Sequence, residues 1–523
     1  MFDELFNYKL SEIFKLLSIL RVDFYVALYS FGLRLPLVTY SQLVQDKYCI
    51  NTLRVEVSKC LQLGSAEVEF QDLKNQVLAY STTFAVYDML TMSSPGIFSM
   101  IFFGYWIDAY PNQLKYLLAL PALGGCLCGI MTIANVYYFN ANTYHLLWKC
   151  IPYALTGGAF IVYTGSYTYI ARTTKPKYRV IRFAVLDLFT FSANPLATAI
   201  AGKLLITEPW ISGQYRNYLA VFVTGFVTFF IGLVWVLVFI DNKFEISKEM
   251  DNPGENLNID EMRQTDLLKP KSLFTVIKEI FSPLTFIKIV KVCFHSRSNN
   301  RRLILWNLLI NMTLVFIVAF DETVIGFQFS QKIYHWDASE YSYSSATIAL
   351  VSALISPLLS LLFIHKLHFS DTSLSIIGSA SSIISMSILG GYLDSVGYFI
   401  AKSLMIFSGL FAICTRSILS RIIDNQETGQ IFSLLACIES IAPTLGTFIY
   451  SSLFNATIAT LPGAAHHMGA VIMFYPFIVS LWLSLTRKKW DPIEIKLIQE
   501  QEKRKQEENN KRNVKIKSID LID

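Results

Sequence analysis

The stretch YLAVFVTGFVTFFIGLVWVLVFI at residues 218–240 decides the fold class of this chain. It carries no charged side chain. A helix of this length rises about 1.5 Å per residue and therefore crosses the roughly 30 Å hydrocarbon core of a bilayer. The stretch predicts a transmembrane helix, and it is one of a series.

Apolar runs of similar length recur on both sides of this stretch, each ended by proline, glycine or charged residues. Six runs precede residue 241 and six follow residue 302. We therefore expect an all-α membrane protein with twelve transmembrane helices in two bundles of six. The predicted spans are 22–43, 81–106, 114–139, 145–170, 181–206, 218–240, 303–330, 342–365, 371–393, 398–418, 429–454 and 463–485.

The composition agrees with a membrane protein. Of the 523 residues, 53% are hydrophobic and only 16% are charged, whereas soluble domains carry about a quarter charged residues. The formal net charge of +5 is concentrated in particular loops instead of forming one basic stripe. We therefore expect no nucleic-acid partner.

The pattern divides the chain into five segments. Residues 1–21 alternate charge with Phe and Leu, which is typical of an amphipathic segment on the cytosolic surface. The two bundles occupy 22–241 and 303–486. The charged stretch 242–302 is the cytosolic linker between them, and 487–523 form a polar cytosolic tail.

Loop charges predict the orientation, because Lys and Arg accumulate on the cytosolic side. The segment 45–76 mixes both signs of charge and is expected outside the cell or in a lumen. An even number of spans then places both termini in the cytosol. Without a clear sorting signal, we favour the plasma membrane over lysosomes. The cytosolic clusters are Arg172, Lys175, Lys177, Arg179 and Arg182, and Arg487, Lys488 and Lys489.

Two of the eight cysteines, Cys49 and Cys60, fall in the segment expected to face outward. An oxidising compartment allows a disulfide between them. The alternative is two free thiols, because the spacing alone does not decide.

Two six-helix halves joined by a long linker suit an alternating-access carrier, in which substrate binds between halves that rock around it. The same number of spans also suits some channels and receptors. The sequence has no Walker loop, nucleophile elbow or metal-spaced His/Cys cluster. We expect no enzymatic activity, no cofactor and no metal site.

The segment TRSILSR at 415–421, followed by ETGQIFS at 427–433, resembles the junction of spans ten and eleven in one transporter family. IRFAVLD at 181–187, Trp336-Asp337 and residues 53–63 also match. The family is that of the proton-coupled folate transporter and the thymic stromal cotransporter, solute carrier family 46 of the major facilitator superfamily. The resemblance implies the major facilitator fold and proton-coupled movement of organic anions such as folates or peptidoglycan fragments.

Two arginines are the candidates for holding an anion. A charge at mid-bilayer costs from about 3 to over 10 kcal/mol, so it normally faces a partner or a water-filled cavity. Arg34 lies near the midplane of the first predicted span. Arg416, near the cytosolic end of span ten, matches an arginine that the resemblance implicates in substrate binding; the alternative is snorkelling to the headgroups.

Intramembrane carboxylates are the candidates for carrying protons. Asp187 aligns with a family glutamate tied to proton coupling, as the resemblance implies. Asp321 and Glu322 are adjacent and point about 100° apart on a helix; we expect Glu322 in the cavity and Asp321 in a structural pairing. Glu439 in span eleven is a further candidate.

The resemblance also has gaps, since Val318 and Gly158 stand where the family has a histidine and an aspartate. Carboxylates are therefore expected to carry any coupled proton. Glu439 and Asp88, in span two, have an alternative role, which is only to neutralise Arg34. We place the histidines at span ends or in loops, namely His145, His335, His365, His368, His466 and His467.

Gly104 and Asp108 retain part of the superfamily's cytosolic signature after span two. The resemblance implies a gate in which Asp108 makes an ionic or helix-end contact and Gly104 permits close helix approach. The alternative for Asp108 is an acidic residue that merely ends a helix.

These features together predict a secondary active transporter that carries an organic anion in symport with protons. The alternative is a non-transporting membrane receptor or scaffold on the same fold. We expect a monomer or a weak homo-oligomer.

Overall fold

The computed structural model describes residues 20–64, 70–109, 113–174, 179–240, 294, 300–367, 369–423 and 428–491. Nearly all of the predicted N-terminal segment 1–21, most of the linker 242–302 and the tail beyond 491 lie outside these residues. Those parts of the predicted organisation remain predictions.

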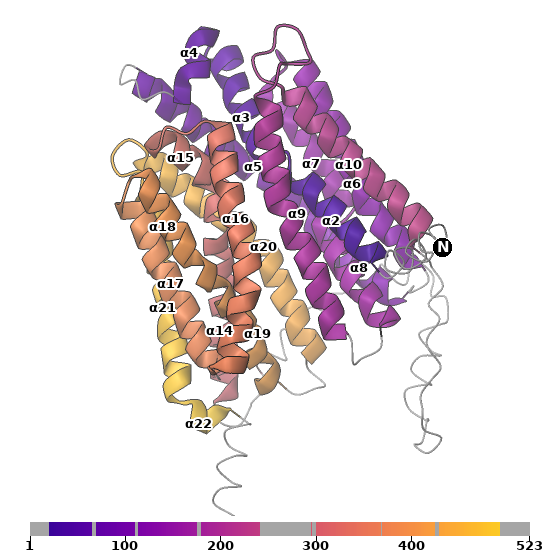
Figure 1. Ribbon diagram of the computed structural model, residues 1–523, viewed down its shortest axis with the longest axis vertical. Helices are drawn as coiled ribbons and strands as arrows, with labels where there is room; N and C mark the ends of the chain where they lie inside the picture. Colours follow the sequence, from indigo (N-terminus) through magenta and orange to yellow (C-terminus); the bar gives the residue numbers. More distant parts are fainter. Residues whose placement is uncertain are drawn as a thin grey trace, which may run out of the picture.

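The described chain is helical and forms two bundles that lie side by side (Figure 1). Helix α9 of the first bundle packs against α16 of the second, and α5 packs against α20. The first bundle contains α2 (Arg21–Arg34), α3 (Leu37–Lys47), α5 (Gln71–Ala109), α6 (Leu114–Tyr137), α7 (Cys150–Leu155), α8 (Gly158–Thr173), α9 (Arg179–Leu205) and α10 (Tyr218–Phe239), with a short α4 (Val57–Leu61).

The second bundle is built in the same way. Its first span, like the first span of the first bundle, consists of two shorter helices. The bundle contains α14 (Arg301–Ala319), α15 (Phe327–Ile333), α16 (Ala338–Leu361), α17 (Asp371–Gly391), α18 (Ser395–Met405), α19 (Gly409–Ile422), α20 (Thr428–Thr457), α21 (Ala464–Leu485) and a short α22 (Arg487–Trp490).

Eight helical segments among the described residues are long and apolar enough to cross a membrane. The other four predicted spans coincide with helix pair α2–α3 and with α5, α16 and α20. Large apolar side chains are exposed along the outer faces of the bundles, such as Phe230 and Val238 on α10 and Phe474 and Ile478 on α21. Such exposure is typical of helices that contact lipid.

The first span departs from the single helix predicted for 22–43. Helix α2 ends at Arg34, and α3 begins at Leu37 after Pro36. Proline has no backbone N–H and its ring clashes with the preceding turn, so a helix interior breaks there. The break places Arg34 at a helix end inside the span.

Two further spans are interrupted. Between α7 and α8 the chain turns at Gly157, whose φ of 82° is a conformation that a side chain strains. Between α14 and α15 a one-turn π-helix, η7 (Glu322–Gly326), follows Asp321. π-Helical turns of this kind often occur at functional sites.

The structure contains a disulfide between Cys49 and Cys60, so of the two alternatives left by the sequence it has the bonded one. The bond ties α4 to the short π-helix η1 (Tyr48–Thr52) that follows α3. We call the end of the molecule that carries this disulfide the outer end, and the opposite end the inner end.

Candidate functional site

At the outer end, the two bundles are joined mainly by uncharged side chains. Gln45 donates to Gln331 at 2.9 Å, and Gln331 donates to Gln42 at 3.3 Å. On the next turn, Gln328 donates to the hydroxyls of Ser41 at 2.9 Å and Ser81 at 3.2 Å. All four glutamines are buried. We call the set Ser41, Gln42, Gln45, Ser81, Gln328 and Gln331 the outer gate. Lys332 also donates to Gln71 at 2.8 Å, and Lys74 lies 3.2 Å from His335.

The contact continues inward along α5 and α20. The Asn455 amide donates to Thr83 at 2.9 Å, and its carbonyl accepts from Thr82. Further in, Thr444 donates to Ser93 at 2.9 Å. Asn455, which fits a glycosylation pattern in the sequence, therefore has its side chain engaged in this seam.

At the inner end, the ion pairs among the described residues each stay inside one bundle. Arg182 of α9 grips the buried Asp23 of α2 with two hydrogen bonds, at 2.7 and 3.2 Å. Arg421 of α19 pairs with Asp371 of α17 and, at 3.2 Å, with Asp491.

Between these two ends lies the first part of the candidate site, on α2 and α8. Arg34 interacts electrostatically with the hydroxyl of Tyr163, which also lies 3.2 Å from the Ser30 hydroxyl. Tyr167 follows Tyr163 by four residues on α8, so both side chains lie on one face of the helix.

The second part of the site joins the two bundles. Tyr167 donates a hydrogen bond to the carboxylate of Asp187 on α9. The same hydroxyl interacts electrostatically with Arg416 on α19 of the other bundle. Asp187 is half-buried and Arg416 is exposed. The structure therefore brings the predicted residues Arg34, Asp187 and Arg416 to one region, linked by two tyrosines.

Other predicted site residues are placed only along the backbone. Gly104 and Asp108 lie in the last turns of α5, Glu322 begins η7, and Glu439 lies in α20. Their side chains are outside what the structure describes, so the gate assigned to the first two and the proton-carrying roles assigned to the others stay predictions.

The alternative role proposed for Asp88 is wrong. Asp88 pairs with Lys149 at 2.9 Å instead of Arg34, and it accepts hydrogen bonds from Tyr40 at 2.8 Å and from the Cys150 thiol at 3.2 Å. The Lys149 ammonium also lies over the Tyr40 ring, 3.9 Å from its centre. Lys149 lies close to a predicted span boundary, so no sequence signal marked it as an intramembrane partner.

One of the histidines that the sequence places at span ends is nevertheless buried and paired. His466 lies in the first turn of α21, but only 1% of its side chain is exposed, and its Nδ1 lies 2.8 Å from Asp321 Oδ2. The structural pairing expected for Asp321 is therefore present, with a partner that the sequence did not suggest. The missed signal is that a buried carboxylate needs a cation or a donor.

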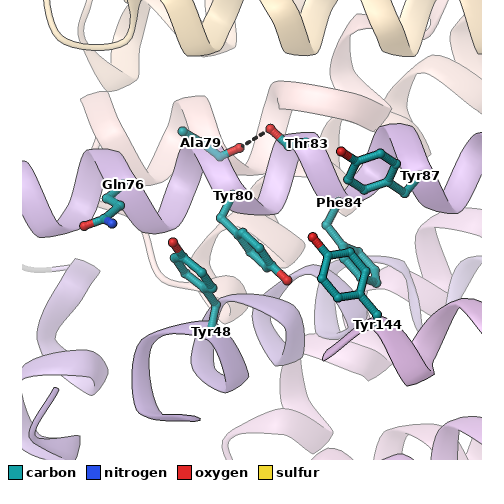
Figure 2. Close-up of a pocket in the computed structure, with 8 residues that line it drawn as sticks. All are labelled: Tyr48, Gln76, Ala79, Tyr80, Thr83, Phe84, Tyr87 and Tyr144. Carbon is teal, nitrogen blue, oxygen red and sulfur yellow. Dashed lines mark hydrogen bonds between the residues drawn. The ribbon is translucent and has the colours of Figure 1, made fainter. Parts of the chain in front are cut away.

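A cavity of about 220 Å³ lies elsewhere, within the outer half of the first bundle. Figure 2 shows its aromatic lining, in which Tyr48 stacks on Tyr80 with ring centres 3.7 Å apart. Ligand pockets are commonly about 300–1,000 Å³. The cavity includes none of the predicted site residues; its lining is Tyr48, Gln76, Ala79, Tyr80, Thr83, Phe84, Tyr87 and Tyr144.

Most of the chain is similar in sequence to known proteins. Residues 89–486 match the family model of the Major Facilitator Superfamily. The chain is 24% identical over 386 residues to the proton-coupled folate transporter of Bos taurus, covering 73% of this chain and 75% of that protein. It is 23% identical over 392 residues to the lysosomal proton-coupled steroid conjugate and bile acid symporter SLC46A3 of Mus musculus, covering 73% and 76%.

Solved structures share the fold at lower identity. A peptide transporter POT in complex with sulfate is 12% identical, with a TM-score of 0.57, and the match covers 91% of this chain and 94% of that one. The human organic anion transporter MFSD10 (TETRAN) is 11% identical, with a TM-score of 0.55, covering 88% and 98%.

Proposed function

The chain belongs to the major facilitator superfamily, and from that membership we propose that it is a secondary active transporter that moves an organic anion together with protons. It is a multi-pass membrane protein, and its family and relatives are transporters, not enzymes. The observation that carries the proposal is the group Arg34, Tyr163, Tyr167, Asp187 and Arg416, which spans both bundles.

The two arginines favour an anionic substrate. A guanidinium stays charged at every relevant pH and presents donors in a fork that matches a carboxylate or phosphate. Arg34 belongs to one bundle and Arg416 to the other, so an anion between them would contact both halves of the carrier. Contact with both halves is what alternating access requires of its substrate.

Asp187 offers a way to couple the anion to a proton. The ionised Asp187 carboxylate accepts a hydrogen bond from Tyr167, and the same hydroxyl interacts electrostatically with Arg416. The carboxylate therefore competes with an anionic substrate for the positive charge of Arg416. Protonation of Asp187 removes that competitor. Proton and anion then favour one another's binding, which is the linkage a symporter needs.

The contacts between the bundles support a conformation closed at the outer end. Closure there depends mainly on hydrogen bonds between uncharged side chains, together with the Lys332–Gln71 and Lys74–His335 contacts, and each hydrogen bond between uncharged groups contributes only about 1 kcal/mol net. A gate of this kind opens at modest cost, as a carrier that cycles between two states requires. We assign the outer end to the outside of the cell and both termini to the cytosol.

The relatives suggest the substrate class and a choice of membrane. Their names refer to folate and to steroid conjugates and bile acids, and one is named as lysosomal. We propose that this chain carries an organic anion of comparable kind, acts at the plasma membrane, and works as a monomer or weak homo-oligomer.

Uptake of labelled folate, bile acid and other organic anions, at about pH 5.5 and about pH 7.5, tests the proposal. The protein is expressed at the surface as wild type, as Asp187→Asn and as the matched control Glu208→Gln, which changes an exposed outer-loop carboxylate. We expect acid-stimulated uptake that Asp187→Asn abolishes and Glu208→Gln keeps. No flux of any anion by a surface-expressed wild type would favour a receptor or scaffold instead.

A further inference from the structure

The second bundle buries a carboxylate–histidine pair that the site above does not use. Asp321 lies two residues after the end of α14 and His466 lies in the first turn of α21, and each side chain is 1% exposed. The pair is separated by 145 residues in sequence and by 2.8 Å between Oδ2 and Nδ1. Both groups therefore meet only because the bundle folds.

Not every polar atom of the pair has a hydrogen-bond partner, so the pair can bind a proton. Among the described residues, neither Asp321 Oδ1 nor His466 Nε2 has a hydrogen-bond partner. The Tyr450 hydroxyl, on α20, is equally without one and interacts electrostatically with Asp321. Gly469, one turn after His466, lets this hydroxyl approach α21, since a Cβ there would lie 2.7 Å from it.

Within the described part of the chain, Tyr450 is one of the ionisable groups on the surrounding elements. The others are Tyr334 after α15, Asp394 at the start of α18, Tyr398 and Lys402 on α18, and His467 next to His466. Where α17 packs against α21, the facing residues Met386 and Gly390 do not titrate. The following residue, Glu322, has a side chain outside the described part of the chain. Asp321 and His466 are thus the carboxylate–imidazole pair of this region.

The charge of the pair depends on one proton. With His466 protonated and Asp321 ionised, the pair is net neutral and each charge has its partner. Loss of the proton leaves a carboxylate in a dry, low-dielectric place, and an unpaired buried charge is far more costly than a paired one. The deprotonated pair is therefore stable only where water reaches it.

The pair also contacts α15, the helix that carries Gln328 and Gln331 of the outer gate. The ring of Phe329 meets the His466 ring edge to face, with centres 4.3 Å apart. Phe329 lies on α15 beside Gln328 and two residues before Gln331, which make the gate contacts to the other bundle. Asp321 itself immediately precedes the π-helix η7, the irregular turn through which α14 leads into α15.

We propose that Asp321 and His466 form a proton-binding pair whose protonation holds the outer gate closed. A proton arriving from outside binds at the imidazole, completes the ion pair and allows the region to dehydrate. Loss of the proton favours hydration, and α15 then moves away from the first bundle. The inference rests on the proposed proton-coupled transport and adds a second proton site, in the other bundle from Asp187.

A distance measurement across the outer end tests the proposal without any substrate. Spin labels are placed on two exposed positions, Glu208→Cys in the first bundle and Val396→Cys in the second. The labelled protein also carries His335→Gln and Lys74→Met, because these two side chains lie 3.2 Å apart between the bundles and each titrates in its own right. Distances are recorded from about pH 5.5 to about pH 8.

We expect one short distance at acid pH and a growing longer population as the pH rises. The double variant Asp321→Asn with His466→Gln keeps the size and hydrogen bonding of the pair but removes its charge. It should show no pH-dependent change. The proposal is overturned if the parent shows no shift, or if the double variant shifts as the parent does.

A second variant protects the test against misfolding. Asp321→His with His466→Asp exchanges the two groups and retains a proton-binding pair, so it should reproduce the parent's shift. A folded exchanged protein without the shift overturns the proposal. Uptake assays separate the proposed transport function from the proposed proton-binding pair. A wild type without acid-stimulated uptake rejects the transport function, whereas the distance measurements test the pair independently.

Discussion

At the scale of single residues, charges inside the membrane are paired with groups from distant parts of the chain. Asp88 and Lys149 illustrate this, with side chains that are 21% and 15% exposed. Such a pair adds little net stability compared with apolar residues, but removing one partner leaves the other charge without compensation. The consequence is testable in each partner separately.

Lys149→Met should lower the free energy of unfolding by about 2–4 kcal/mol, because Asp88 then remains charged in a low-dielectric place. The double variant Asp88→Asn with Lys149→Met should recover most of the loss. Thermal unfolding in detergent, followed by size-exclusion chromatography, measures both. Equal losses in the single and double variants would show that the ion pair is not the cause.

Lys74, at the outer end of α5, is buried opposite the second bundle, and burial together with Lys332 lowers its pKa to about 8. Closure of the outer gate lowers the pKa of Lys74, so the protonated side chain opposes closure and the neutral side chain does not. The free-energy penalty that protonated Lys74 places on closure is full below about pH 8, and it fades as the pH rises toward the ordinary lysine pKa of about 10.5.

Lys74→Met should therefore stabilise the outer closure at neutral pH, by about 2 kcal/mol, with the benefit shrinking above about pH 8. Melting temperatures of wild type and variant, measured from about pH 7 to about pH 10, should converge at the alkaline end. A constant difference over that range would exclude titration of Lys74 as the origin.

The sequence could identify Arg34 because a charge within an apolar run stands out without any knowledge of the fold, and it could identify Asp187 and Arg416 through the resemblance to solute carrier family 46. It could not identify Tyr163, Tyr167 or the Asp321–His466 pair. Tyrosine is common in membrane helices and carries no such contrast. Which carboxylate meets which cation depends on how helices distant in sequence pack.

At the scale of helices, the interruptions position the site. The break at Pro36 places Arg34 at the end of α2, and the turn at Gly157 sets the direction of α8, which carries Tyr163 and Tyr167. The proline break follows from covalent chemistry. The turn at Gly157 does not, since glycine also occurs inside regular membrane helices.

Gly157→Ala should disturb α8, because φ is 82° and the new Cβ would lie 2.3 Å from Ile161 Cγ1. Left-handed geometry alone costs about 1–2 kcal/mol for a residue with a side chain. Gly213→Ala is the matched control, since its φ is 86° with nothing within 4 Å.

We expect both alanine variants to lose some stability but only Gly157→Ala to lose anion uptake, as it displaces Tyr163 and Tyr167. Melting temperatures and initial uptake rates at acid pH separate the two effects. Equal uptake by the two variants would mean that the turn does not position the site.

At the scale of the whole molecule, the bundles meet at the outer end mainly through hydrogen bonds between uncharged side chains, while the described inner-end ion pairs remain within single bundles (Figure 1). The exposed Arg416 lies on α19, whose last turns lie at the inner end. This asymmetry predicts which side of the membrane reaches the site.

Arg416→Cys should react with a membrane-impermeant thiol reagent in inside-out vesicles and only slowly in intact cells, because the outer gate closes the other route. The wild-type protein, with its buried Cys126, Cys150 and Cys414, serves as the control for background labelling. Faster labelling from outside would contradict the proposed orientation or the closed outer gate.

The sequence by itself determined that this protein is a bundle of membrane helices, because the hydrocarbon core demands long apolar runs whose backbone groups are satisfied internally. It also marked candidate charges within the spans, since these contrast with the apolar runs. Only the tertiary structure decided that Asp88 meets Lys149, that Asp321 meets His466, and that Arg416 faces Tyr167. Those contacts depend on packing between helices far apart in the chain. The local sequence of a membrane helix says little about which other helices it packs against.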